Sequence, residues 1–434
     1  MKVAAIIAEY NPFHNGHKYL IEETRRLTGA DYVLALMSGN FVQRGAPSLC
    51  HKYLRTKMAL SCGADAVLEL PTLYALSSAE FFASGSVSLL NALGTVDYLS
   101  FGSESGDITL LTQTAKQLVE LSPAHEAQIT GLLKEGYSYP AARAQVFSAA
   151  EIALNGQDNY DGSLPLDTLA APTSLLCSPN NILGLEYCKA LNHSHSSIIP
   201  FTVKRMGNDY HQIGLSEDAS SFGSASAIRK ALETPSSASY AEIKAHVPKE
   251  VYALMEQDNL LQNHIISDDF SALLHYKLLS EQKEGFSQYL DCTPDLSDKI
   301  CKYLPEYTTL SDFILKLKSK DLTYTRISRV LFHILLNITY PDWYQDFLST
   351  HRLFTPYARL LGFRKDATPL LSSISKNSSV PLLSKPADAS AYLDEKAYAL
   401  FSEDVYCASV YETVRFHKTG QAALNEFRQS PIIL

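Results

Sequence analysis

Residues 9–17 decide the fold, and they read Glu9-Tyr10-Asn11-Pro12-Phe13-His14-Asn15-Gly16-His17. The apolar run at residues 3–8 comes directly before them and predicts a strand buried on both faces. Residues 19–24 follow with the spacing of a helix. The stretch therefore lies where a strand gives way to a helix, which is the first unit of an α/β fold.

Two histidines, His14 and His17, flank Gly16 at this junction. The first backbone N–H groups of a helix have no partner inside the helix, and the helix dipole adds roughly half a positive charge there. Gly16 lets a ligand approach the backbone, and the imidazoles add donors. We interpret the stretch as a phosphate site with His14 and His17 as candidate catalytic residues. The alternative is that both are surface or capping histidines.

Length and composition are those of a globular protein with more than one domain, because the chain has 434 residues and 46% of them are hydrophobic. No apolar run is long enough for a membrane span, and the N-terminus lacks the features of a signal peptide. Seven scattered cysteines argue against a disulfide framework or a zinc ribbon and favour a cytoplasmic location. A net charge of −9 does not indicate nucleic-acid binding, but it allows a local basic patch.

Strand and helix patterns alternate through the first half of the chain. After the opening strand, apolar runs occur at residues 31–37, 66–71, 96–101 and 196–203. This alternation predicts an α/β fold with a doubly wound parallel sheet. The polar loops 38–45 and 102–107 follow two of these strands, and ligands of such sheets bind at the carboxyl ends of strands. We therefore expect these loops to share one site with residues 9–17.

The pattern changes near residue 236, where long helical segments begin to dominate. We expect an α/β catalytic domain at residues 1–235 and a mainly helical region at residues 236–434. Within the first domain, residues 108–156 are predicted to be mostly helical and 157–172 to form a loop. Within the second, residues 364–387 are rich in Ser, Pro and Lys and are predicted to form an exposed connection.

Further candidate residues follow later strands or begin later helices. Gly102 is either a turn glycine or a position where an adenine or ribose lies on the backbone. Asn180 and Asn181 either cap a helix or contact a ligand. Arg205 comes just after a strand, at the edge where an arginine most naturally binds phosphate or carboxylate.

Residues 224–229 suggest a second phosphate-binding segment. Ser224 and Ser226 begin a predicted helix, and Arg229 follows one turn later. Hydroxyl and N–H groups at a helix start, with an arginine beside them, suit a phosphate. Ordinary helix capping is the alternative.

Basic residues cluster in the helical half with aromatic residues between them. The candidate RNA contacts are Arg326, Arg329, Arg359 and Arg364. Arginines mixed with aromatic rings suit a phosphate backbone and stacked bases. A solvated helix face is the alternative.

Taken together, these residues make the chain resemble the bacterial tRNA(Met) cytidine acetate ligase family over essentially its whole length. The most specific motifs lie at residues 9–17, 38–45, 101–104, 179–184 and 204–205. H-x-G-H alone is less specific, since related nucleotidyltransferases and class I tRNA synthetases share it. The resemblance implies a nucleotidyltransferase-like catalytic domain followed by a helical tRNA-binding region.

The implied activity is that of an ATP-dependent ligase. Acetate and ATP form acetyl-adenylate, and the acetyl group passes to N4 of the wobble cytidine of elongator tRNA(Met), which becomes N4-acetylcytidine. The resemblance implies ATP contacts at Ile7, Ala8, Glu9, Tyr10, Asn11, Pro12, Phe13, His14, Asn15, Gly16, His17, Lys18, Tyr19, Leu20, Gly102, Asn180 and Arg205. The segment of Ser224, Ser226 and Arg229 resembles the serine-rich loop of related enzymes only in outline.

Chemistry adds expectations for the first step. His14 and His17 would donate to phosphate oxygens, while Arg205 and Arg229 would neutralise the departing pyrophosphate. Mg²⁺ is expected on the β- and γ-phosphates, held mainly by ATP and water because no carboxylate cage is visible.

The acetate pocket and the second step are less determined. Tyr10, Asn11 and Phe13 are expected as walls of a small acetate pocket. His14, His17 and Glu9 all remain open as the base for the amine proton. The alternative function is a small-molecule adenylyltransferase without an RNA substrate, and the oligomeric state is open.

Overall fold

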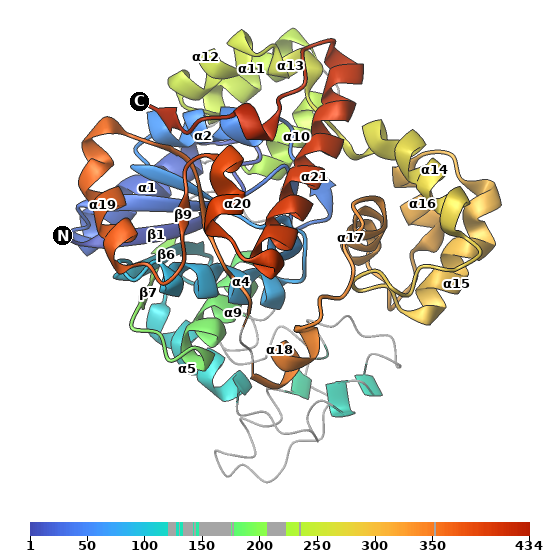
Figure 1. The fold of residues 1–434 in the computed structure, drawn as a ribbon, viewed down its shortest axis with the longest axis horizontal. Helices are drawn as coiled ribbons and strands as arrows, with labels where there is room; N and C mark the ends of the chain where they lie inside the picture. The colour runs from blue at the N-terminus through green and yellow to red at the C-terminus, as the bar shows by residue number, and fades with distance from the viewer. Residues whose placement is uncertain are drawn as a thin grey trace.

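The computed structural model describes residues 1–119, 178–205, 223–233, 236–350 and 353–434, with short pieces between residues 127 and 175. The predicted loop 157–172 and most of the predicted helical stretch after residue 119 lie outside the described residues. Figure 1 shows an α/β body with a helical lobe (α14–α16) to one side, and both chain termini on the opposite side of the body.

One large sheet forms the centre of the body, with strand order β10-β8-β5-β2-β1-β6-β7. The strands predicted in the first half are β1 (Val3–Ala8), β2 (Tyr32–Ser38), β5 (Ala66–Leu70), β6 (Tyr98–Ser103) and β7 (Ile199–Lys204). Neighbours among them pair in parallel, which confirms the predicted α/β fold. Successive strands extend from β1 first toward β5 and then toward β7. The topological switch point, where such folds bind ligands, therefore lies between β1 and β6.

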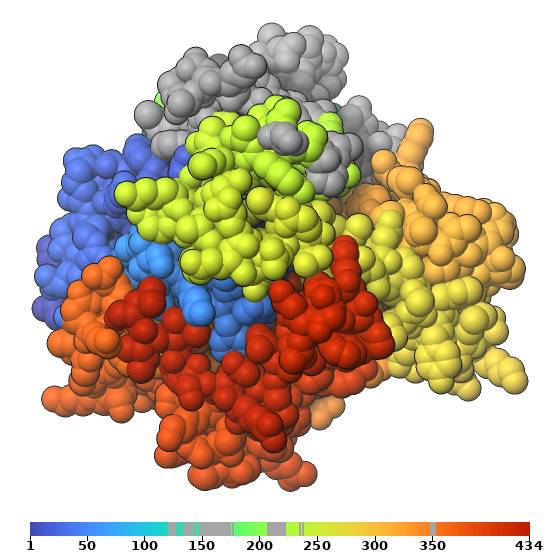
Figure 2. All heavy atoms as spheres, turned by 90° about the horizontal axis from the view of Figure 1, so that it is seen from above, coloured from blue at the N-terminus to red at the C-terminus, as the bar shows by residue number. Residues whose placement is uncertain are grey.

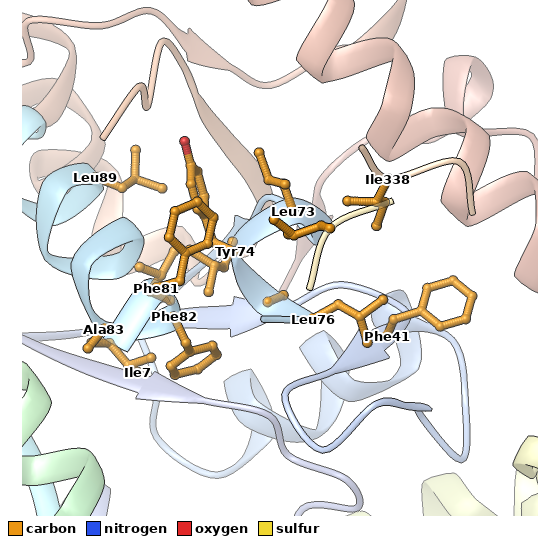
Figure 3. Packing of buried hydrophobic residues seen from close by; sticks show 14 of the residues in the cluster. Ile7, Phe41, Leu73, Tyr74, Leu76, Phe81, Phe82, Ala83, Leu89 and Ile338 are labelled. Carbon is orange, nitrogen blue, oxygen red and sulfur yellow. The ribbon is translucent and has the colours of Figure 1, made fainter. Parts of the chain in front are cut away.

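Consecutive residues of a strand point to opposite faces of the sheet, and in these strands the side chains on both faces are apolar. Helices therefore cover both faces. Ile7 and Leu34 pack on one face, where Figure 3 shows Phe82 beside Ile7. The helices on that face include α4 (Ala79–Ala92), α5 (Ile108–Val119) and α9 (Pro179–His193). Ile6 and Val33 pack on the other face. Its helices include α1 (Asn15–Thr28), α2 (Lys52–Ser61) and α10 (Ala225–Glu233).

Strands from the second half complete the sheet. β8 (Ala358–Phe363) pairs antiparallel with β5, while β9 (Leu382–Leu383) and β10 (Ile432–Ile433) pair in parallel with β8. The exposed connection expected at residues 364–387 is wrong, because this stretch contains β9 and α19 (Thr368–Asn377). α19 buries Leu370 and Ile374, which lie one helical turn apart.

The second half is otherwise helical, as predicted, and the proposed boundary at residue 235 stays a prediction. Its other α-helices are α11 (Ser237–His246), α12 (Lys249–Gln257), α13 (Leu260–Asn263), α14 (Ser271–Glu281), α15 (Pro294–Tyr303), α16 (Leu310–Leu317), α17 (Tyr324–Leu335), α18 (Tyr344–Thr350), α20 (Ala389–Tyr392) and α21 (Glu395–Thr419). Seen from above in Figure 2, the C-terminal residues (red) lie against residues from the beginning of the chain (blue), while the lobe projects to one side. None of the described helices has the length and apolar character of a membrane span.

Four buried charges join the two halves of the chain. Lys52 Nζ lies 2.7 Å from Glu69 Oε1 and 3.0 Å from Glu426 Oε2, and Arg359 NH1 lies 3.1 Å from Glu69 Oε2. Arg359 also pairs with Glu426 and is only 2% exposed. The expectation that Arg359 contacts RNA is therefore wrong, because buried carboxylates already bind its guanidinium group.

Candidate active site

α1 begins at the predicted strand–helix junction, and the two histidines form its cap. His14 is the N-cap residue, and its Nδ1 accepts a hydrogen bond from Gly16 N at 3.0 Å. Nδ1 of His17 accepts in turn from His14 N at 3.2 Å. The two rings stack with their centroids 3.7 Å apart. The alternative interpretation, that both histidines cap the helix, is thus correct for their Nδ1 atoms. The Nε2 atom of each ring is not used by the cap and can contact a ligand.

Both imidazoles are neutral donors in this arrangement. Burial, with His17 and nearby arginines, holds the pKa of His14 well below its usual value. Burial and the charge of Arg205 lower the pKa of His17 to about 3. A neutral ring whose Nδ1 accepts must carry its proton on Nε2. Each histidine therefore presents one Nε2–H, and both side chains line the same cavity.

This cavity of about 640 Å³ lies at the switch point of the sheet, and its volume is within the usual range for a ligand site. It contains most of the predicted site residues. The predicted residues among its walls are Ile7, Ala8, Glu9, His14, Gly16, His17, Tyr19, Leu20, Gly102, Asn180 and Arg205. Residues from loops 9–17 and 38–45 and from the ends of β6 and β7 meet here, as the sequence predicted.

Six other predicted ATP contacts are not among the described cavity walls, namely Tyr10, Asn11, Pro12, Phe13, Asn15 and Lys18. Tyr10 and Phe13 are buried in the core, with ring centroids 4.9 Å and 5.4 Å from the His17 ring. The two aromatic rings support His17 from the core side, and the Asn11 side chain accepts from Leu49 N at 2.8 Å. None of these three residues is among the described cavity walls, and their expected role in the acetate pocket stays a prediction.

The wall beyond β6 is built by three predicted residues. A Cβ atom on Gly102 would lie 3.4 Å from Arg205 Cγ, so the glycine leaves room for the arginine stem along the strand end. Asn180 lies at the start of α9, where its Nδ2 donates to Glu104 Oε1 at 2.7 Å. Glu104 Oε2 also accepts from Asn181 N at 2.8 Å. A carboxylate of the protein therefore occupies the N-terminus of α9, which leaves the phosphates to the start of α1.

The second predicted phosphate segment begins beside the cavity, because the preceding residue, Gly223, is one of the cavity walls; its phosphate role stays a prediction. Ser224, Ser226 and Arg229 are not among the described cavity walls. Ser224 Oγ caps α10 by accepting from Ala227 N at 3.1 Å. Arg229 donates to Asn11 O at 2.7 Å and to Ser226 Oγ at 3.0 Å. The segment therefore fixes the backbone of loop 9–17 from outside the cavity.

Several residues of the site are not singled out by the sequence. Gln43 and Arg44 line the cavity from the loop after β2, and Gln43 N donates to Glu9 Oε1 at 3.0 Å. The sequence marks their motif as a whole but assigns no role to either side chain. Thr325 and Arg329 reach the cavity from α17. From the sequence, Arg329 is predicted only as a surface contact.

Arg55 joins two of the loops around the cavity. It is fully buried, and its guanidinium donates to Glu9 O at 2.6 Å, to Ser38 O at 3.0 Å and to Gly39 O. These carbonyl groups follow β1 and β2. Nothing in the sequence distinguishes this arginine from one on a helix surface.

The described cavity walls do not form a metal site. Glu9 is the only carboxylate among them, and the described residues include no cluster of three metal-ligating side chains. Three or more oxygen ligands from the protein would be typical of a dedicated cation site. The cavity walls that the structure describes therefore do not fit a protein-held Mg²⁺.

Comparison with known proteins places the chain in a class and then in a family. The family model described as HIGH Nucleotidyl Transferase matches residues 1–425, in agreement with the sheet and with the histidine pair. A protein of Acetivibrio thermocellus named tRNA(Met) cytidine acetate ligase is 38% identical over 442 residues, with all of both chains covered. One of Clostridium perfringens with the same name is 37% identical, also with full coverage. The chain belongs to the tRNA(Met) cytidine acetate ligase family.

A solved structure agrees with this assignment. Thermotoga maritima TmcAL bound with alpha-thio ATP superposes with a TM-score of 0.85 at 27% identity and covers 100% of both chains. The apo form of the same protein gives a TM-score of 0.86.

Proposed function

We propose that this chain activates acetate with ATP and then acetylates N4 of the wobble cytidine of elongator tRNA(Met). The observation that carries the first step is the stacked pair of His14 and His17, which presents two Nε2–H donors at a helix start inside the switch-point cavity. Family membership, together with the ATP analogue bound to Thermotoga maritima TmcAL, supports the choice of substrates.

In the first step, an acetate oxygen attacks the α-phosphorus of ATP, and pyrophosphate leaves with the electron pair of the broken P–O bond. His14 and His17 donate to phosphate oxygens as negative charge moves toward the leaving group. Arg205, which lines the cavity, neutralises part of that charge. Mg²⁺ accompanies ATP as its phosphate complex, and no step here depends on a protein-held metal.

In the second step, the cytidine amine attacks the acyl carbon of acetyl-adenylate, AMP leaves with the electron pair of the broken C–O bond, and the amine loses a proton. Glu9 is the only carboxylate among the described cavity walls, but it already accepts from Gln43 N. His14 and His17 have no free lone pair, because Nδ1 of each ring accepts a backbone N–H and Nε2 carries the proton. Glu9, whose Oε2 atom does not accept from Gln43 N, is therefore the candidate for the base. The cytidine must leave its stack to reach the cavity, as base-modifying enzymes require.

Removal of either histidine tests the proposal. His14→Ala and His17→Ala are expected to lower acetate-dependent exchange of pyrophosphate into ATP by about 100-fold or more, the usual effect of losing a preorganised donor. Binding of tRNA should stay within about twofold of wild type, because neither histidine is proposed to contact RNA. His417→Ala, at an exposed position of α21, is the matched control and should change neither value.

Labelled acetate separates this function from adenylyl transfer to a small acceptor. With ATP and tRNA, the ligase gives labelled adenylate and labelled tRNA. Wild-type protein that gives neither would refute the proposal, and equal exchange in wild type and both histidine variants would refute the roles of His14 and His17.

A further inference from the structure

α17 brings the second half of the chain into the catalytic cavity. Thr325 and Arg329 lie four residues apart on α17, and both line the cavity that contains His14 and His17. Residues on the opposite side of the helix, such as Val330 and Leu331, are fully buried in the core. The cavity is therefore completed by a helix outside the α/β body.

Contact with the loop after β2 fixes the position of α17. Gly45 has a φ of +78°, and a Cβ atom there would lie 2.5 Å from the backbone nitrogen of Arg329. Ser328 Oγ donates to Gly45 O at 2.5 Å. The backbone of Arg329 therefore lies directly against the loop that carries Gln43 and Arg44, so the three side chains belong to one wall of the cavity.

The guanidinium group of Arg329 forms no close ion pair in the described part of the chain, and the nearby carboxylate of Asp291 acts on it only from a longer distance. Its side chain is half-buried, and burial lowers its pKa. Its Nε is buried without a hydrogen-bond partner among the described residues. A buried, unpaired donor costs free energy, and this cost disappears when an acceptor binds. This pattern contrasts with Arg359, whose carboxylate partners belong to the protein.

The location of Arg329 indicates which ligand supplies the acceptor. The nucleotide site lies at the switch point between β1 and β6, where the histidines, Gly102 and Arg205 gather. Arg329 instead lies beside the loop after β2, on the other side of β1. An acceptor nucleotide has to approach acetyl-adenylate from a side that ATP does not occupy. A nucleotide within RNA brings a phosphodiester group with it, and arginine binds such a group with two parallel hydrogen bonds.

We propose that Arg329, with Thr325 and the loop at Gln43 and Arg44, forms the subsite for the acceptor nucleotide, in which Arg329 binds a phosphodiester next to the flipped cytidine. This inference rests on the proposed function. It assigns Arg329 to acetyl transfer and not to acetate activation, so the two half-reactions separate the possibilities.

Full-length Arg329→Met and Arg329→Lys test the subsite. Acetate-dependent pyrophosphate exchange, measured without tRNA, is expected to stay within about twofold of wild type in both variants. Acetyl transfer to tRNA under subsaturating tRNA is expected to fall about 30-fold in Arg329→Met, the usual range for one lost phosphate or base contact. Arg329→Lys, which keeps the charge but not the planar fork, should fall at least fivefold. Arg26→Met is the matched control, because Arg26 is exposed near the end of α1, pairs with Glu23 and has no proposed contact with ATP or RNA.

Each outcome decides the inference. A parallel loss of exchange and transfer in both folded variants would assign Arg329 to ATP and overturn the subsite. Unchanged transfer in both variants would also overturn it. If Arg329→Met melts well below wild type, Arg329→Lys decides alone, and wild-type transfer in that variant overturns the proposal. Wild-type protein without acetate-dependent exchange would overturn the proposed function itself, and this inference with it.

Discussion

The chemistry of the two histidines is set by backbone contacts and not by their charge. Gly16 N and His14 N donate to the two Nδ1 atoms, which places both protons on Nε2. Burial and Arg205 keep the pKa of His17 near 3, so its ring stays neutral across the pH range of a cell. The two histidines thus offer fixed donors to phosphate without carrying positive charge themselves.

Arg55 is expected to be the residue on which loop geometry depends most. Its guanidinium donates to carbonyl groups after β1 and β2, so Arg55→Met would leave several buried acceptors unsatisfied. We expect the free energy of unfolding to fall by about 3 kcal/mol. Arg26→Met, which removes an exposed pair with Glu23, should change it far less than Arg55→Met, because exposed ion pairs contribute little to stability. Urea denaturation measures both values, and equal effects would contradict the role given to Arg55.

Burial of single residues was the hardest property to predict from the sequence. The histidine pair was found because its signal is local, namely a motif between an apolar run and a helix. The sequence misassigns Arg359 to the RNA surface, because β8, the strand that carries it, is not predicted. Its partner Glu426 lies far away in the chain, and no local pattern predicts such a pair.

Helices and strands show the same difference between local sequence signals, which can be predicted, and contacts between distant segments, which cannot. β1, α1 and the other strands of the first half were predictable, because each has its own apolar pattern and is followed by a helix that covers it. β9 and β10 are two residues long, so neither has a period that a sequence pattern can show. β8 depends on pairing with β5 from the other half of the chain. The cavity wall on α17 escaped prediction for a similar reason, since only packing against Gly45 places Arg329 there.

Gly45 is expected to control the position of α17. Gly45→Ala would place an alanine in an unfavourable left-handed conformation, with its Cβ atom 2.5 Å from the backbone nitrogen of Arg329. The backbone of α17 cannot move aside as a flexible side chain could. Gly29→Ala is a matched control, because Gly29 has a φ of +64° and a Cβ atom added there would meet nothing within 4 Å. We expect Gly29→Ala to lower stability by about 1 kcal/mol with normal acetyl transfer.

For Gly45→Ala we expect a larger loss of stability and a loss of acetyl transfer that exceeds any loss of pyrophosphate exchange. Thermal melting and the two half-reaction assays measure these effects. Identical behaviour of the two alanine variants would show that contact with α17 does not depend on Gly45.

At the scale of the whole molecule, the two halves of the chain share a sheet, a core and a buried charge cluster. β8 covers the edge of β5, and Leu361 packs in the same cluster as Ile6 and Val33. Arg359 and Glu426 from the second half surround Lys52 and Glu69 from the first. A catalytic domain ending at residue 235 would therefore lack part of its own core.

A chain truncated after residue 235 is expected not to fold. Lys52 and Glu69 would lose both partners from the second half, and loss of one member of a buried charge cluster typically costs about 3–5 kcal/mol. The exposed edge of β5 would add a template for aggregation. We expect the fragment to be insoluble or to unfold without a cooperative transition, whereas mixing it with residues 236–434 during refolding should restore some ATP binding. A soluble fragment 1–235 with cooperative urea unfolding and wild-type ATP affinity would contradict this and would support an independent domain boundary at residue 235.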